Sequence, residues 1–137
     1  MTRVLFLCVH NSARSQLAEG ILRAMAGDRI KVFSAGSAPS FVHPLAIQVL
    51  RERGINASQH RSKSVNEFAN EKFDYVITLC AEEICPVFLG ATMRLHWALP
   101  DPSAIQCDSN MQLGAFRDTA REIEMRISDW LAKLDSQ

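Results

Sequence analysis

The residue with the clearest chemical potential is Cys8, which follows the apolar run from Val4 to Leu7 and precedes a short polar loop. Arg14 and Ser15 follow that loop. The thiolate is the nucleophilic form of cysteine, and nearby positive groups and helix N-termini favour it. A planar guanidinium can hold two oxygens of an oxyanion at once. The spacing therefore predicts a nucleophile that attacks a bound tetrahedral oxyanion, with a buried packing cysteine as the alternative.

The loop after Cys8 has a composition that suits anion binding. Asn11 tolerates the left-handed backbone conformation, and the small residues Ser12 and Ala13 let the chain turn tightly. A loop between a strand and a helix N-terminus presents several backbone N–H groups to an anion. We therefore expect an oxyanion-binding loop made of Val9, His10, Asn11, Ser12, Ala13, Arg14 and Ser15.

Two side chains of this loop need separate treatment. The Ser15 hydroxyl either donates a hydrogen bond to the Cys8 sulfur or caps the following helix, and the sequence leaves both readings open. The His10 side chain is expected to face solvent, so we give it no catalytic role.

Strand-like and helix-like segments alternate along the chain. The expected strands are Val4–Leu7, Ile30–Ser34, Tyr75–Leu79 and Met93–Trp97. The expected helices are Ser15–Met25, Pro44–Arg53, a short Ser64–Ala69 and a long Leu113–Leu134. Such alternation predicts an α/β fold, a four-stranded parallel sheet with helices on both faces, whose ligands bind beyond the carboxyl ends of the strands. Cys8, Cys80 and Asp101 all fall at or just beyond such ends.

Length and charge limit the possible classes. The chain has 137 residues, 47% of them hydrophobic, which suits one domain spanning 1–137. Its 15 basic and 15 acidic residues balance, so no overall field draws it to nucleic acid or to an anionic membrane. The apolar N-terminal run is too short for a signal peptide or a membrane span. We expect a cytoplasmic monomer.

The four cysteines, at positions 8, 80, 85 and 107, are too scattered for a structural zinc site, and we predict no metal. In a reducing compartment, cysteines at loop ends are better read as chemically active than as structural bridges. Cys107 lies in a polar stretch and is expected to be an incidental thiol.

The pattern Cys8-x5-Arg14-Ser15, placed between the first strand and the first helix, resembles the low-molecular-weight protein tyrosine phosphatase family. The fuller run CVHNSARSQLAEG is similar to the thioredoxin-coupled arsenate reductase branch of that family. The same similarity extends along nearly the whole chain through Ser34-Ala35-Gly36, Val76-Ile77-Thr78-Leu79-Cys80, Cys85-Pro86, His96-Trp97 and Asp101-Pro102.

This resemblance implies reduction of arsenate to arsenite, as in arsenic detoxification, through a relay of cysteines. Cys8 would attack arsenic while Asp101 protonates the departing oxygen, and Cys80 would then attack the Cys8 sulfur and release arsenite. Cys85 would resolve the bridge into a Cys80–Cys85 disulfide. Thioredoxin or a glutathione and glutaredoxin system would reduce that disulfide, and no tightly bound cofactor is implied.

The interval between Cys80 and Cys85 sets a geometric condition. If residues 81–85 were helical, the two α-carbons would lie about 8 to 9 Å apart, beyond the disulfide range of about 4.4 to 6.8 Å. We therefore expect this segment to unwind and rearrange on oxidation, which would carry the disulfide to the surface.

Two other functions compete with reduction. A phosphatase would use the same Cys8 loop and hydrolyse phosphate monoesters through a phosphocysteine, but it has no use for Cys80. The stretch after Pro102 also carries no aromatic residue before Phe116 to wall a phosphotyrosine site. The third possibility is an inactive oxyanion-binding module.

The resemblance also raises the question of a potassium ion, which some thioredoxin-coupled members bind beside the loop. Asn11, Glu19 and Ser34 match its side-chain ligands, but Lys63 stands where the remaining carboxylate would be expected. We expect the Lys63 ammonium group to pair with Glu19 in place of the cation, with a solvated surface lysine as the alternative.

Overall fold

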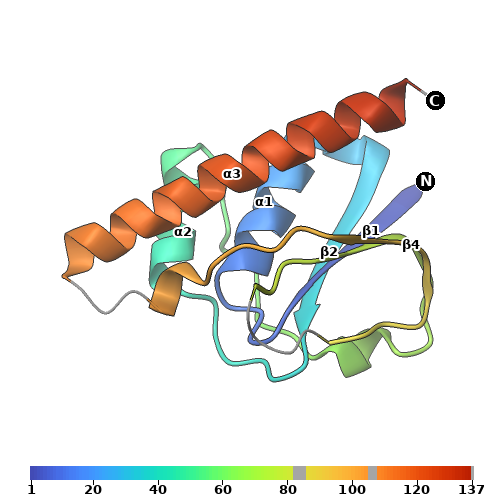
Figure 1. Ribbon diagram of the computed structural model, residues 1–137, viewed down its shortest axis with the longest axis horizontal. Coiled ribbons are helices and arrows are strands. Elements are labelled where there is room, and N and C mark those ends of the chain that lie inside the picture. Colours follow the sequence, from blue (N-terminus) through green and yellow to red (C-terminus); the bar gives the residue numbers. More distant parts are fainter. Residues whose placement is uncertain (82–85, 105–107, 137) are drawn as a thin grey trace.

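A computed structural model describes residues 1–81, 86–104 and 108–136 (Figure 1). The strands are β1 (Thr2–Cys8), β2 (Ile30–Gly36), β3 (Phe73–Thr78) and β4 (Ala91–His96). The α-helices are α1 (Arg14–Ala26), α2 (Pro44–Glu52) and α3 (Ser109–Asp135). Three short 3-10 helices are η1 (Gly27–Arg29), η2 (Val65–Phe68) and η3 (Pro102–Ala104).

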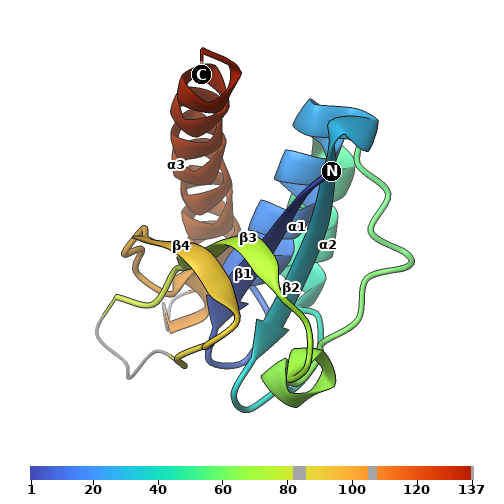
Figure 2. The ribbon, with the colours of Figure 1, turned by 90° about the vertical axis from the view of Figure 1, so that its right-hand side faces the viewer.

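The four strands form one parallel sheet in the order β2-β1-β3-β4 (Figure 2). The central position of β1 explains its sequence, because a strand buried on both faces of a parallel sheet is a continuous apolar run. Val4, Leu5, Phe6 and Leu7 are fully buried. The predicted four-stranded parallel sheet is confirmed, and Cys8 lies at the end of one of its two central strands.

The two faces of the sheet are covered unequally. The three α-helices pack on the face that carries Val4 and Phe6, and they form the larger core with α3 lying across α1 and α2 (Figure 1). On the other face, η2 and the segment around Phe88 cover a smaller cluster of aromatic rings in edge contact. Helices are therefore present on both faces, as predicted, but among the described residues the second face carries only the single turn of η2.

Helix α3 begins at Ser109, four residues before the predicted start at Leu113. The prediction relied on apolar spacing, and the first turn of α3 has no buried residue to reveal it. The start is set instead by Asp108, whose carboxylate accepts a hydrogen bond of 2.9 Å from the backbone N–H of Met111. Within the residues that the structure describes, no helix is long and apolar enough to cross a membrane.

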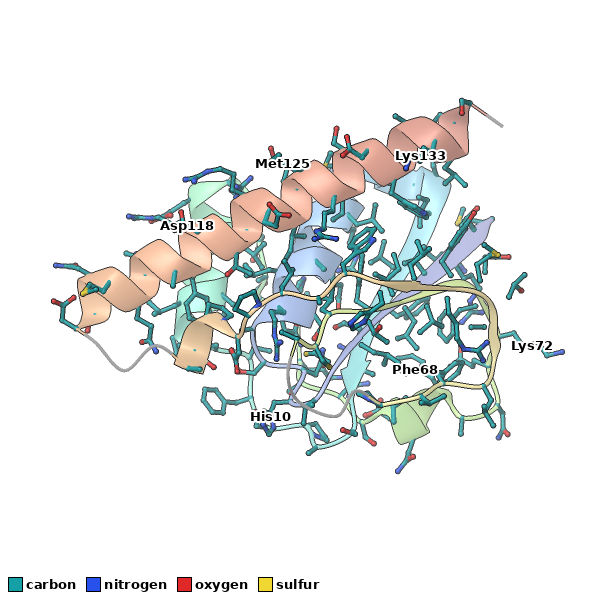
Figure 3. All side chains as sticks on the ribbon, in the orientation of Figure 1. His10, Phe68, Lys72, Asp118, Met125 and Lys133 are labelled. Carbon is teal, nitrogen blue, oxygen red and sulfur yellow. The ribbon has the colours of Figure 1, made fainter. Side chains whose placement is uncertain are left out.

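Helix α3 closes the larger core, and its buried face makes a test of that packing. Ile123 is 0% exposed, so Ile123→Ala is expected to lower the free energy of unfolding by about 2 to 4 kcal/mol through lost burial and the cavity left behind. Met125, two residues further along, lies on the outer face of α3 (Figure 3) and is 59% exposed. Met125→Ala should change stability by less than about 0.5 kcal/mol. Urea denaturation of both variants checks this, and equal effects would contradict the packing of α3.

Candidate active site

The loop after β1 is held by hydrogen bonds from the segment that follows β2. The backbone N–H groups of Ala38, Ser40 and His43 donate to the carbonyl oxygens of Val9, His10 and Ser12 respectively, at 2.9, 3.2 and 3.1 Å. In a trans peptide the C=O and the next N–H point in opposite directions. Each carbonyl that is drawn outward therefore turns the following N–H inward, toward the space above Cys8.

These inward N–H groups are free to bind an anion. No acceptor among the described residues takes a hydrogen bond from the backbone N–H groups of residues 10–13. The loop turns through Asn11, whose φ of 48° is the left-handed conformation that the sequence predicted for it. Helix α1 starts at Arg14 directly after the loop, so its N-terminal dipole adds positive potential at the same point. The loop can hold a tetrahedral oxyanion.

Gly36 allows the close approach between β2 and this loop. A β-carbon at position 36 would lie 2.4 Å from the Val9 carbonyl oxygen and 2.9 Å from the Asn11 nitrogen. Both are backbone atoms that cannot rotate away, so position 36 must be glycine for the loop to keep its shape.

Cys8 is 2% exposed, and its sulfur lies 2.8 Å from the Ser15 hydroxyl. The Asn11 side-chain amide donates to that same hydroxyl oxygen at 2.8 Å. Because the Ser15 oxygen already accepts from Asn11, its own hydrogen is available for the Cys8 sulfur. Of the two readings left open for Ser15, the geometry favours the donor to sulfur, and no side-chain cap is recorded at the start of α1. A hydroxyl donor stabilises a thiolate.

Arg14 reaches the other side of the same space. Its guanidinium donates to the carbonyl oxygens of Leu79 and Leu99 at 3.3 and 2.9 Å, just beyond the ends of β3 and β4. The second terminal nitrogen lies 3.9 Å from a carboxylate oxygen of Asp101. The other Asp101 oxygen accepts hydrogen bonds from the Ser103 backbone and hydroxyl. Cys8, Arg14, Ser15 and Asp101 therefore lie in one place, as the sequence analysis expected.

Cys80 is 1% exposed and lies just beyond β3. The neighbouring strands β1 and β3 pair Leu7 with Thr78. Cys8 is one residue beyond that pair in β1, and Cys80 lies two residues beyond it, after the end of β3. Such strands lie about 4.8 Å apart. Cys80 takes part in a disulfide, whereas Cys8 is a free thiol. Cys85 and Cys107 lie outside the described residues, as does most of the segment expected to rearrange.

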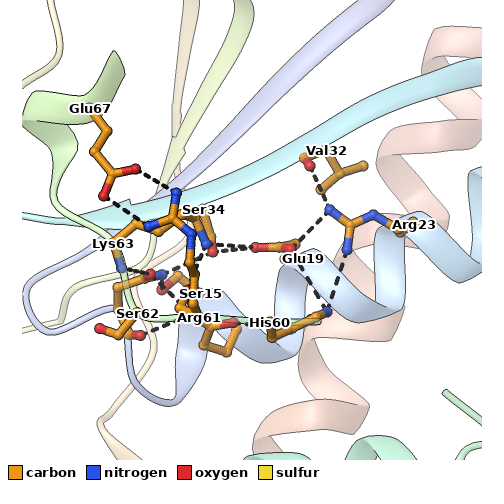
Figure 4. Close-up of polar contacts among 12 residues, drawn as sticks. Ser15, Glu19, Arg23, Val32, Ser34, His60, Arg61, Ser62, Lys63 and Glu67 are labelled. Carbon is orange, nitrogen blue, oxygen red and sulfur yellow. Dashed lines mark hydrogen bonds and ion pairs between the residues drawn. The ribbon is translucent and has the colours of Figure 1, made fainter. Parts of the chain in front are cut away.

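Glu19 is the centre of a buried polar network that supports the loop from below (Figure 4). Its carboxylate accepts a short hydrogen bond from Ser34 and lies 3.6 Å from the Lys63 ammonium group, 2.9 Å from Arg23 and 3.7 Å from His60. The expected pairing of Lys63 with Glu19 is therefore observed. Ser34 in turn accepts from the Asn11 amide at 2.9 Å, which connects the network to Ser15 and Cys8.

Burial and pairing compete in this network. Burial alone would raise the pKa of Glu19, but the charge of Lys63, the Ser34 hydrogen bond and the charges of His60 and Arg23 outweigh it, so the pKa lies below its ordinary value. Burial lowers the pKa of His60 and of Lys63, and Glu19 opposes both shifts. His60 is thus held neutral at pH 7 while Glu19 is ionised.

A pocket of about 360 Å³ opens above Cys8. Besides Cys8, Arg14 and Asp101, its walls include Ser40, Phe41 and His43 from the segment before α2. Those three residues were not predicted from the sequence. Neither were His60 beside Glu19 and Gln16, whose side-chain amide donates to Asn11 and contacts His60. One available signal was His43-Pro44, because a residue before a proline at a helix start commonly caps that helix. The long loop between β2 and α2 was another, since such loops often line sites.

Comparison with known proteins places this fold and site in a family. Residues 3–137 match the family model described as low molecular weight phosphotyrosine protein phosphatase. The glutaredoxin arsenate reductase of Synechocystis sp. is 32% identical over 98% of this chain and 99% of its own. The solved structure of an arsenate reductase in the phosphate binding state has a TM-score of 0.81 and 33% identity, covering 97% of this chain and 98% of that one.

A third similar protein is the thioredoxin-dependent arsenate reductase of Corynebacterium glutamicum, with a TM-score of 0.75 and 35% identity. The match covers this whole chain but 64% of that one. On these findings the chain belongs to the low molecular weight phosphotyrosine protein phosphatase family.

The Glu19 network makes a prediction about stability and pH. Lys63→Met should destabilise the protein by about 1 to 3 kcal/mol at pH 7, because it leaves a buried carboxylate with less compensation. The lowered pKa of Glu19 means that its contribution is present above the unfolded value near 4.5 and is lost as pH falls through the folded pKa. The gap in stability between variant and wild type should therefore narrow as the pH falls below 4.5.

Denaturation curves between pH 3 and 7 measure this gap, and Lys72→Met, at an exposed position, is the matched control (Figure 3). A loss that matches the control, or one that stays constant from pH 7 to 3, would show that the pairing with Glu19 does not carry the effect.

Proposed function

We propose that this protein reduces arsenate to arsenite, with Cys8 as the nucleophile. The observation that carries the proposal is a second cysteine, Cys80, at the end of the strand beside the one that ends at Cys8. A phosphatase needs one thiol and water, whereas a reduction that ends in a disulfide needs two thiols. The similar proteins named arsenate reductase, at 32% to 35% identity, support the same assignment.

In the first step the Cys8 thiolate attacks arsenic and forms a sulfur–arsenic bond. The inward N–H groups of the loop and Arg14 hold the equatorial oxygens, where charge accumulates. We assign Asp101 as the acid that gives a proton to the departing oxygen, which leaves as water or hydroxide. Ser15 stabilises Cys8 as the thiolate before attack. This step is common to phosphate and arsenate, and it changes no oxidation state.

The second step transfers the electrons. The Cys80 thiolate attacks the Cys8 sulfur, the sulfur–arsenic bond breaks, and its electron pair leaves with arsenic as arsenite. A Cys8–Cys80 disulfide remains. Cys85 then attacks the Cys80 sulfur, which frees the Cys8 thiolate and forms a Cys80–Cys85 disulfide. At its end this relay leaves Cys8 as a free thiol and Cys80 in a disulfide. The free thiol at Cys8 and the disulfide at Cys80 in the structure support this order.

An external dithiol must supply two electrons per turnover. One similar protein is named a glutaredoxin arsenate reductase and another a thioredoxin-dependent arsenate reductase, so both reductant systems are candidates here. The proposal includes a single domain over residues 1–137, a monomer and a cytoplasmic location.

Phosphate monoester hydrolysis at Cys8 is the second candidate, because the family model is that of a phosphatase and the loop does not distinguish phosphate from arsenate.

The main test is an assay of arsenite production, run with thioredoxin, thioredoxin reductase and NADPH and in parallel with glutathione and glutaredoxin. Wild type should produce arsenite in at least one system, and Cys80→Ser should lower the rate by more than about 100-fold, because the electron transfer loses its thiol. Cys107→Ser is the matched control and should keep the wild-type rate. No arsenite in either system, with hydrolysis of p-nitrophenyl phosphate that persists in Cys80→Ser, would favour the phosphatase instead.

The order of the relay has a separate test. After a single turnover of arsenate, Cys85→Ser should accumulate the Cys8–Cys80 disulfide, because the resolving thiol is absent. Mass spectrometry of peptides prepared without reductant detects this bridge directly. The wild-type protein, treated in the same way, should show a bridge between Cys80 and Cys85. Neither a Cys8–Cys80 bridge nor a glutathione adduct in the variant would overturn the order of attack.

A further inference from the structure

His43 stands over the pocket of Cys8, in a position that the proposed mechanism does not use. It lines the same cavity as Cys8, Arg14 and Asp101. Its backbone N–H donates to the Ser12 carbonyl oxygen of the loop at 3.1 Å. This hydrogen bond fixes His43 to the loop that would bind the anion, so the His43 side chain is held beside the anion site.

The imidazole ring of His43 has little freedom. Its Nδ1 accepts a hydrogen bond of 3.1 Å from the backbone N–H of Leu45, which caps the start of α2. The ring packs against Phe116 of α3, with 4.6 Å between ring centroids, and against Phe41 at 6.1 Å. Phe116 is fully buried, whereas Phe41 is 59% exposed at the rim. Both the position and the orientation of the ring are therefore set by the fold.

The cap also decides which nitrogen carries the proton. Because Nδ1 accepts from Leu45, the neutral ring must be protonated at Nε2. No acceptor for this Nε2–H lies among the described residues. The Nε2 atom is not fully buried, so a ligand can reach it. His43, which lines the pocket, therefore carries a hydrogen-bond donor that has no acceptor among the described residues.

The charge of the ring depends on its neighbours. Burial lowers the pKa of His43 and the carboxylate of Asp101 opposes that shift, so the ring is neutral at pH 7 and its Nδ1 can accept from Leu45. The titratable and charged groups around the same pocket are Cys8, His10, Arg14 and Asp101. Helix α3 contributes the apolar Phe116 ring at this point.

We propose that His43 is an oxyanion-binding residue, which donates its Nε2–H to an oxygen of the tetrahedral anion that faces away from the loop. The loop amides and Arg14 would hold the oxygens nearest Cys8, and the remaining oxygen would face the other residues that line the pocket, among them Asp101 and His43. The inference deepens the proposed function and rests on it only in taking this pocket as the oxyanion site.

Sulfate binding tests this role without any turnover, because sulfate remains a dianion between pH 5 and 8. Isothermal titration calorimetry should find that His43→Asn binds sulfate about 10-fold more weakly than wild type at pH 7.5, as expected for one lost hydrogen bond to a charged group. The loss should be present at pH 7.5, where the ring is neutral and donates only through Nε2. The asparagine oxygen can still accept from Leu45, so the cap of α2 is preserved.

His96→Asn is the matched control, since it makes the same change at an exposed histidine on β4 whose Nδ1 contacts Thr78 and which does not line this pocket. It should bind sulfate as wild type does. Equal sulfate affinity in His43→Asn and wild type would overturn the proposal. So would an equal loss of affinity in His96→Asn, because that pattern indicates an effect that does not come from this pocket. A protein that produces no arsenite, but whose His43→Asn variant binds sulfate more weakly, would refute the reductase and leave His43 as an anion ligand.

Discussion

The site depends on where the carbonyl groups of one short loop point. Three hydrogen bonds from residues 38, 40 and 43 draw the carbonyls of Val9, His10 and Ser12 outward, and the planarity of the peptide bond then turns the N–H groups inward. The anion binding that we propose therefore depends on backbone geometry more than on any charged side chain. The order of the sheet, with β2 beside β1, is what brings the segment after β2 alongside the loop.

The same arrangement explains why the reacting groups come from distant parts of the sequence. Parallel strands end at one edge of the sheet, so β1, β3 and β4 deliver Cys8, Cys80 and the chain leading to Asp101 to the same edge. Arg14 connects them, because its guanidinium donates to carbonyls beyond β3 and β4 while its backbone opens α1. A single side chain therefore holds the ends of two strands in register with the loop.

Sequence reasoning succeeded where the information was local. The strand, loop and helix around Cys8 follow from the apolar run, the small residues and the spacing to Arg14, and the left-handed Asn11 follows from its residue type. It failed for His43 and His60, because their roles come from contacts across the fold that no periodicity records. The early start of α3 was missed for another reason, since Asp108 signals the helix through a cap and not through an apolar pattern.

The pairing of Lys63 with Glu19 has a consequence for the conditions under which the loop keeps its shape. A diffusible cation beside Glu19 would be bound more or less fully as its concentration changed, so the stabilisation of the loop would depend on the composition of the medium. A lysine is attached to the chain, and its local concentration is fixed by the backbone. Side chains that are 11% and 6% exposed are also poorly screened by salt, unlike the exposed pair of Arg61 and Glu67. The nucleophile loop of this protein should therefore keep its geometry across a wide range of ionic environments.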